Sequence, residues 1–243
     1  MSQIIKQTIL YQAGELEMCG TLYKNATLQS HAAILAFPEA PGPGANIHSR
    51  AERLAELGYA VMVSDLHGGG QPLTDFADIM ARLEKLRGDA TTTRLRARAA
   101  YTAALKATGC SAQQLGVIGF CFGGTMALEL ARDGAELGAI IGFHSGLAPL
   151  AKAAEKKLSC PVLVCIGADD PSIPPVIRAA FEAEMTNSQS DWSIALYGNT
   201  IHSFTDVNAA RMNRPEFARY SPEADAASWD AMLSLFKRTI DQA

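Results

Sequence analysis

The stretch LGVIGFCFGGTMALELA (115–131) decides the fold class of this chain. An apolar run of strand length passes directly into a segment with helical spacing, and the pattern Gly-x-Cys-x-Gly-Gly lies between them. A sharp strand-to-helix turn of this kind lifts its central residue clear of a sheet, and small residues two positions to either side prevent collisions. The stretch therefore predicts an α/β protein with a nucleophile elbow, and it places Cys121 at the tip of the turn.

The predicted turn at Cys121 suits a nucleophile. Free backbone N–H groups and the positive dipole end at the start of the following helix stabilise a thiolate and an oxyanion. The alternative interpretation is a small buried cysteine that packs as an inert apolar group. Gly119 and Gly123 flank the cysteine at the spacing of an elbow and favour the nucleophile.

Apolar runs of strand length recur along the rest of the chain. They are AAILAF (32–37), YAVMVS (59–64), LGAIIGF (137–143), PVLVCIG (161–167) and WSIALY (192–197). Segments with helical spacing alternate with them, at 47–58, 91–109, 124–134 and 174–185. The alternation predicts right-handed crossovers and a mostly parallel central sheet with helices on both faces.

The two ends of the chain complete the predicted architecture. The segments Ile4 to Tyr11 and Glu17 to Tyr23 alternate in polarity and predict an antiparallel hairpin. The chain after Trp229 predicts a final amphipathic helix, and residues 206–222, which lack a clear period, are expected to form a flap near the site. No repeat or long linker interrupts the pattern, so we expect one α/β domain over residues 1–243.

Composition and charge restrict the class of partner. Hydrophobic residues make up 48% of the 243 residues and charged residues 19%, which is typical of a packed globular protein. The formal net charge of −4 provides no positive field to attract nucleic acid or an anionic membrane. No signal-peptide pattern opens the chain, and no apolar run reaches the roughly 18 residues of a membrane span. We expect a small-molecule partner, with neither nucleic acid nor membrane involved.

The cysteines form an odd and scattered set, at positions 19, 110, 121, 160 and 165. Their spacing fits neither a disulfide framework nor a C-x-x-C metal site. This usage predicts a cytoplasmic protein. We expect no metal and no organic cofactor, and a monomer or a homodimer.

The turn GADDPSIP (167–174) offers two carboxylates after a strand. In α/β-hydrolases an acid and then a histidine follow the nucleophile, each on a loop after a later strand. Asp169 and Asp170 both fit the place of the acid. Either one can instead cap the helix expected near Pro174, so that one caps while the other orients the base.

His202 follows the run 192–197 and is the only histidine after both the elbow and the acid turn. This order predicts that His202 takes the proton of Cys121 while a carboxylate holds its tautomer. The alternative for such a histidine is a surface or core residue without catalytic function. His144 precedes the acid turn and breaks the order, so we expect it to line the pocket.

The elbow, acid turn and histidine loop together resemble the dienelactone hydrolase family, a cysteine branch of the α/β-hydrolases, over nearly the whole chain. The strongest matches are AFPEAPG (36–42), LAELGYAVMVSDLHG (54–68), GFCFGGTMALELA (119–131), GADDPSIP (167–174) and TIHSF (200–204). The resemblance implies an α/β-hydrolase fold and cleavage of a small ester or lactone through an acyl-cysteine. It makes Cys121 the nucleophile, Asp170 the acid and His202 the base.

The resemblance also assigns residues that have no motif of their own. Glu39 matches a glutamate that contacts the resting thiol and shifts when substrate binds; without the resemblance, an exposed loop carboxylate is an equal alternative. The backbone amides of Ala40 and Phe122 are implied as the oxyanion hole. Further residues expected around the thiol and the substrate are His67, His144, Ser203 and Phe204.

Two positions depart from the family pattern. Well-known members hold a substrate carboxylate with arginines where this chain has Gly69 and Asp206, so we expect weaker binding of an anionic lactone. Arginines elsewhere can substitute if their helix faces the pocket, although a charged helix is usually a solvated face. These are Arg82, Arg87, Arg94, Arg96 and Arg98.

Two rival hypotheses use the same residues. One is a catalytically silent binding or sensing protein that keeps the fold and a relic of the site. The other is a redox sensor at Cys121, for which no C-x-x-C partner is visible in the sequence.

Overall fold

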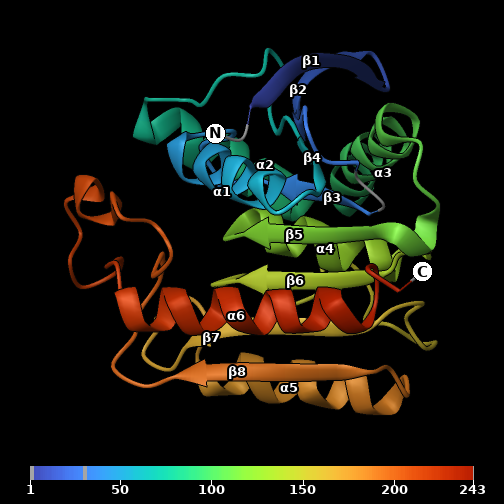
Figure 1. Cartoon of the computed structure of the whole chain (residues 1–243). Helices are drawn as coiled ribbons and strands as arrows, with labels where there is room; N and C mark the ends of the chain where they lie inside the picture. Colours follow the sequence, from blue (N-terminus) through green and yellow to red (C-terminus); the bar gives the residue numbers. More distant parts are fainter. Residues whose placement is uncertain (1–2, 30–31, 243) are drawn as a thin grey trace.

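The computed structural model describes residues 3–29 and 32–242, and the strands of these residues form an eight-stranded sheet (Figure 1). The strand order is β1-β2-β4-β3-β5-β6-β7-β8. The strands are β1 (Ile4–Ala13), β2 (Leu16–Asn25), β3 (Ala33–Phe37), β4 (Ala60–Val63), β5 (Leu115–Phe120), β6 (Ala139–Phe143), β7 (Val162–Gly167) and β8 (Trp192–Tyr197). β1, β2 and β4 pair antiparallel, and the pairs from β4 to β8 are parallel. The mostly parallel sheet and the amino-terminal hairpin predicted from the sequence are confirmed.

Helices cover both faces of the sheet, as predicted. They are α1 (Ala45–Glu56), α2 (Phe76–Gly88), α3 (Ala90–Thr108), α4 (Phe122–Arg132), α5 (Pro175–Asn187) and α6 (Pro222–Arg238), with short 3₁₀ helices at Ala112–Gln114 and Ala209–Met212. Apolar side chains of α1 and α6 pack on one face, and those of α2, α3, α4 and α5 pack on the other (Figure 1). None of the helices in the described residues combines the length and apolar character needed to cross a membrane.

The central strands are apolar without interruption because both of their faces are covered. Every residue of β3, β5, β6 and β7 is buried. Such strands lack the alternation of a half-exposed strand and read as the continuous runs found in the sequence. The carboxyl ends of β5, β7 and β8 lie along one edge of the sheet, which brings together the loops that follow them.

Helix α2 is missing from the sequence prediction. Its apolar residues Phe76, Met80, Leu83 and Leu86 recur at helical spacing, but only Leu83 and Leu86 are buried, whereas Phe76 is 62% exposed and Met80 is 42% exposed. The periodic signal of this helix is therefore present in the sequence over residues 76–86. The predicted start of the last helix is also wrong, because α6 begins at Pro222 rather than after Trp229.

The segment expected as a flap, residues 206–222, lies beside His202. It contains the 3₁₀ helix Ala209–Met212, and Ala218 forms an isolated β-bridge with His202. The backbone N–H of Arg219 donates to the carbonyl of His202 at 3.1 Å. The segment therefore supports the backbone of His202, the predicted base.

Candidate active site

The sequence around Cys121 folds as the sharp turn that its glycines predict. Cys121 joins β5 to α4 with a φ of 53°. A left-handed backbone is uncommon for a residue with a side chain and is frequent in strained functional turns. A Cβ added at Gly119 would lie 2.2 Å from the carbonyl oxygen of Gly123, and one added at Gly123 would lie 2.2 Å from that of Phe37. Glycine is therefore required on both sides of the cysteine.

The acid turn after β7 presents one of its two aspartates to His202. Asp170 is buried, and its Oδ2 accepts a hydrogen bond from His202 Nδ1 at 2.7 Å. Its Oδ1 accepts from the backbone N–H of Ser172 at 2.8 Å, which fixes the carboxylate in the turn. Asp169 is exposed to solvent. The geometry favours Asp170 as the partner of the histidine, which the residues alone left open.

Neither aspartate caps helix α5. The residue before the helix is Pro174, and no side-chain hydrogen bond caps its first turn. The capping interpretation from the sequence is therefore wrong for both carboxylates. The missing cap is partly offset by Pro175 at the first helical position, because proline has no backbone N–H that needs a hydrogen-bond partner.

Cys121 and His202 shift each other's pKa in the direction that favours a charged thiolate–imidazolium pair. Burial alone raises the pKa of the Cys121 thiol, but the charge of His202 and a hydrogen bond with its side chain lower the pKa, and the net shift is downward. Burial alone lowers the pKa of His202, whereas the Cys121 thiolate and Asp170 raise it, and the net shift is upward. Because Nδ1 faces Asp170, Nε2 is the ring nitrogen left for the sulfur. The arrangement favours thiolate and imidazolium.

Backbone groups at the start of α4 also favour the thiolate. The backbone amide of Phe122 lowers the pKa of the Cys121 thiol. This amide is one of the two donors implied for the oxyanion hole. Ala40, which would supply the other, lies on the loop after β3, and the elbow packs against the end of β3 where Gly123 approaches Phe37.

Glu39 opposes the charge of the thiolate. Its Oε1 accepts a hydrogen bond from Asn46 Nδ2 at 2.6 Å, and its negative charge raises the pKa of Cys121. Burial raises the pKa of the Glu39 carboxyl itself, and the charge of Asp206 raises it further. The charge of Glu39 therefore acts against a further anion beside the thiol, and Asp206 acts on Glu39.

His144 and Phe204 lie behind His202 and are fully buried. The His144 ring lies 5.1 Å from the His202 ring and 5.4 Å from the Phe204 ring, and its Nε2 lies 2.9 Å from Thr205 Oγ1. Burial and the charge of His202 lower the pKa of His144 well below its usual value, which keeps it neutral. These positions favour support of the base over contact with substrate. Ser203 is also buried and has a φ of 56° in the same loop.

Three residues that support the site were not predicted from the sequence. Arg50 donates to the carbonyl of Thr205 and to Asp225 Oδ2, the latter at 2.9 Å, so it ties α1 to the histidine loop and to α6. The Phe217 ring packs against the His202 ring in a tilted arrangement, with ring centroids 5.0 Å apart. Asn46 holds Glu39. None belongs to a motif, and each meets the site only through tertiary contacts.

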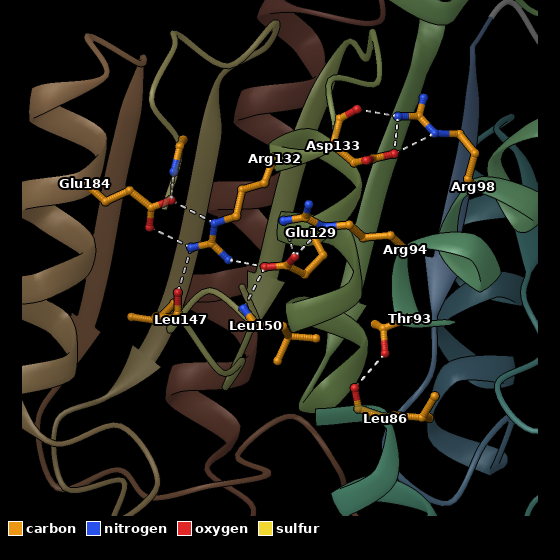
Figure 2. Close-up of polar contacts among 11 residues, drawn as sticks. Leu86, Thr93, Arg94, Arg98, Glu129, Arg132, Asp133, Leu147, Leu150 and Glu184 are labelled. Carbon is orange, nitrogen blue, oxygen red and sulfur yellow. Dashed lines mark hydrogen bonds and ion pairs between the residues drawn. The ribbon is translucent and has the colours of Figure 1, made fainter. Parts of the chain in front are cut away.

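Four of the five arginines considered as substitutes for anion-binding residues have partners of their own. Arg94 pairs with Glu129, and Arg98 pairs with Asp133 (Figure 2). Arg82 pairs with Asp78 on its own helix, Arg96 donates to the carbonyl of Leu66, and Arg87 is exposed. Among the described residues, no group of three or more His, Cys, Asp or Glu side chains is placed to hold a metal ion.

Sheet topology and the elbow together define an α/β-hydrolase fold whose turn presents a cysteine to a histidine and an aspartate. The family model described as the dienelactone hydrolase family matches residues 19–240. The chain belongs to the dienelactone hydrolase family, as its motifs indicate. Membership makes it a hydrolase of the ester- and lactone-cleaving class.

Individual proteins resemble the chain over most of its length. The solved structure named m3DLH is 39% identical with a TM-score of 0.92, and covers 97% of this chain and 98% of its own. P91, a dienelactone hydrolase-like promiscuous phosphotriesterase from metagenomic libraries, is 35% identical with a TM-score of 0.91 and the same coverage. A Bradyrhizobium sp protein named "Probable 2-oxo-3-(5-oxofuran-2-ylidene)propanoate lactonase" is 27% identical over 183 residues, which are 71% of this chain and 73% of that one.

Proposed function

We propose that this protein hydrolyses small, uncharged carboxylic esters or lactones through an acyl-cysteine at Cys121. One observation carries the proposal: His202 lies between the Asp170 carboxylate, at 2.7 Å, and a cysteine held at the tip of a left-handed turn. Nucleophile, base and orienting acid in this relation are the arrangement that acyl transfer requires. The lactonase named above supports lactone cleavage, whereas its substrate, a propanoate, is an anion, so the uncharged substrate class is inferred from the residues around the thiol alone.

The reaction follows from the roles of the three side chains. The thiolate of Cys121 attacks the carbonyl carbon, and the carbonyl oxygen takes the negative charge beside the amides of Ala40 and Phe122. The intermediate collapses, and the protonated His202 gives its proton to the leaving alkoxide. A water molecule then loses a proton to His202 as it attacks the thioester. The carbon–sulfur bond breaks, the carboxylic acid leaves, and the Cys121 thiolate and His202 imidazolium are regenerated. Asp170 holds the imidazole and stabilises its charged form.

Charges around the thiol support an uncharged substrate. Glu39 and Asp206 are carboxylates whose charges act on one another, and the nearby Arg50 is committed to Asp225. A substrate carboxylate would meet repulsion here and would find Gly69 and Asp206 where well-known relatives have arginines. We infer in addition that the chain acts as one domain, as a cytoplasmic monomer or homodimer, without metal or cofactor.

The proposal is tested by incubating the protein with neutral aryl esters and small neutral lactones, each beside an analogue that bears a carboxylate. We expect catalytic turnover of neutral members, slower turnover of their anionic analogues, and one acyl group on the peptide that contains Cys121 after acid quenching. Binding without turnover or adduct across the whole panel would instead identify a silent binding protein and overturn the proposal. Faster turnover of the anionic analogues would refute the inferred substrate charge.

A further inference from the structure

The loop that contains Ala40 is held at three consecutive carbonyl groups. The carbonyl of Glu39 accepts from the backbone N–H of Gly42 at 2.8 Å, and that of Pro41 accepts from the N–H of Leu73 at 2.8 Å. Between them, the carbonyl of Ala40 lies 2.7 Å from Nε2 of His67. The first and third contacts are backbone to backbone, so the middle one is the contact that a side-chain substitution can remove.

The chemistry of this contact fixes the proton on His67. A carbonyl oxygen can only accept, so Nε2 of His67 must carry the proton and donate it to Ala40. Burial lowers the pKa of His67, and the positive charges of Arg82 and Arg96 lower it further, so the ring is neutral. Nδ1 is then a buried lone pair, without a hydrogen-bond partner among the residues that the structure describes. Among the described residues, the His67 side chain therefore makes its hydrogen bond through Nε2 alone.

The backbone around His67 is rigid because Asp65 holds it. The buried carboxylate of Asp65 accepts from the backbone N–H groups of His67 and Gly68, each at 3.1 Å, through Oδ1. Its Oδ2 accepts from those of Gly70 at 2.9 Å and Cys19 at 3.0 Å. Four amide donors on one carboxylate bind this loop to β2 and fix the position from which the imidazole reaches Ala40.

We propose that His67 is a positioning residue for the oxyanion hole. The Ala40 N–H belongs to the peptide of the Glu39 carbonyl, which Gly42 holds, and His67 holds the next peptide at the Ala40 carbonyl, so the two contacts together fix the backbone on both sides of Ala40. This inference rests on the proposed function. A donor in an oxyanion hole is effective only if it already points to where charge develops in the transition state. His67 touches neither the thiol nor the reacting atoms in this account; it acts through the orientation of the Ala40 residue. Its neutral form suffices for that task.

Two variants of His67 separate this role from simple packing. His67→Phe keeps a ring of similar shape without a donor, and His67→Gln keeps a donor near the place of Nε2. We expect His67→Phe to lower kcat about tenfold or more with little change in KM, because the oxyanion exists only in the transition state. We expect His67→Gln to recover most of the loss. If His67→Phe does not fold, His67→Asn, whose amide is too short to reach the carbonyl, takes its place.

Alkylation of Cys121 by iodoacetamide is the internal control, because this reaction forms no oxyanion. Its rate should be alike in wild type, His67→Phe and His67→Gln. The inference is overturned if wild type turns over esters and His67→Phe keeps full kcat, if both variants lose kcat equally, or if alkylation falls in parallel with kcat. Failure of the proposed function looks different, since wild type itself would then show no turnover and the inference would fall with it.

Discussion

Replacement of Cys121 by alanine is expected to lower ester turnover by about a thousandfold or more. The thiol forms the bond to the acyl group, so histidine and aspartate have nothing to activate once the sulfur is gone. Catalysis that remains would come from the backbone donors of the oxyanion hole and from binding. The measurement is kcat/KM for an aryl ester that wild type hydrolyses.

Cys110→Ala is the matched control for this substitution. Cys110 is a partly buried cysteine beside Thr108, at the opposite end of β5 from the elbow. We expect Cys110→Ala to keep kcat/KM within about twofold, as is usual for a change away from the site. Turnover by Cys121→Ala equal to that of wild type would show that another group attacks the substrate.

Replacement of Arg132 by methionine is expected to have the largest effect on stability. Arg132 forms two hydrogen bonds with Glu184, at 2.7 and 2.8 Å, and one with Glu129 at 3.1 Å (Figure 2). Exposed fractions of these side chains are 1% for Arg132, 0% for Glu129 and 3% for Glu184. Removal of the cation leaves two buried carboxylates short of a partner, which costs about 3–5 kcal/mol of the free energy of unfolding.

The network also tethers the segment between β6 and β7, which has no helix or strand over residues 147–154. Arg132 donates to the carbonyl of Leu147 at 2.8 Å, and Glu129 and Glu184 accept from the N–H groups of Leu150 and Ala154 (Figure 2). Loss of Arg132 should therefore loosen this segment together with the contact between α4 and α5.

Urea unfolding of Arg132→Met beside Arg98→Met measures the effect. Arg98 also pairs with an acid, Asp133, but both side chains are 36% exposed, and such a pair contributes about 1 kcal/mol or less. The two variants therefore differ in burial and share the type of lost contact. Equal destabilisation of the two would refute the importance assigned to the buried network.

Much of the site could be predicted because its chemistry depends on local sequence. The elbow needs glycine at fixed offsets from the nucleophile, and the later partners follow later strands, so Cys121 and His202 stand out in the sequence. Asp169 and Asp170 are adjacent and equally polar. The choice between them depends on the direction of one side chain in the folded turn, which residue type does not encode.

The remaining contacts depend on segments that meet only after folding. Arg50 in α1 forms an ion pair with Asp225 in α6, and no motif near either residue predicts this pair. The arginines of α3 read as a solvated face, yet Arg94 pairs with the fully buried Glu129 of α4. Spacing along one helix identifies neighbours on that helix, and it carries no information about which other helix packs against it.

The central claim is that Cys121, His202 and Asp170 act as one unit, and the pH dependence of Cys121 alkylation tests it most directly. Iodoacetamide reacts with the thiolate, so a lowered pKa keeps the rate high below the pH at which a free thiol ionises. Asp170→Asn removes a charge that raises the pKa of His202. The imidazole then loses its proton at lower pH, the thiolate loses its cation, and the midpoint of the rate should move to higher pH. An unchanged midpoint in Asp170→Asn would contradict the account.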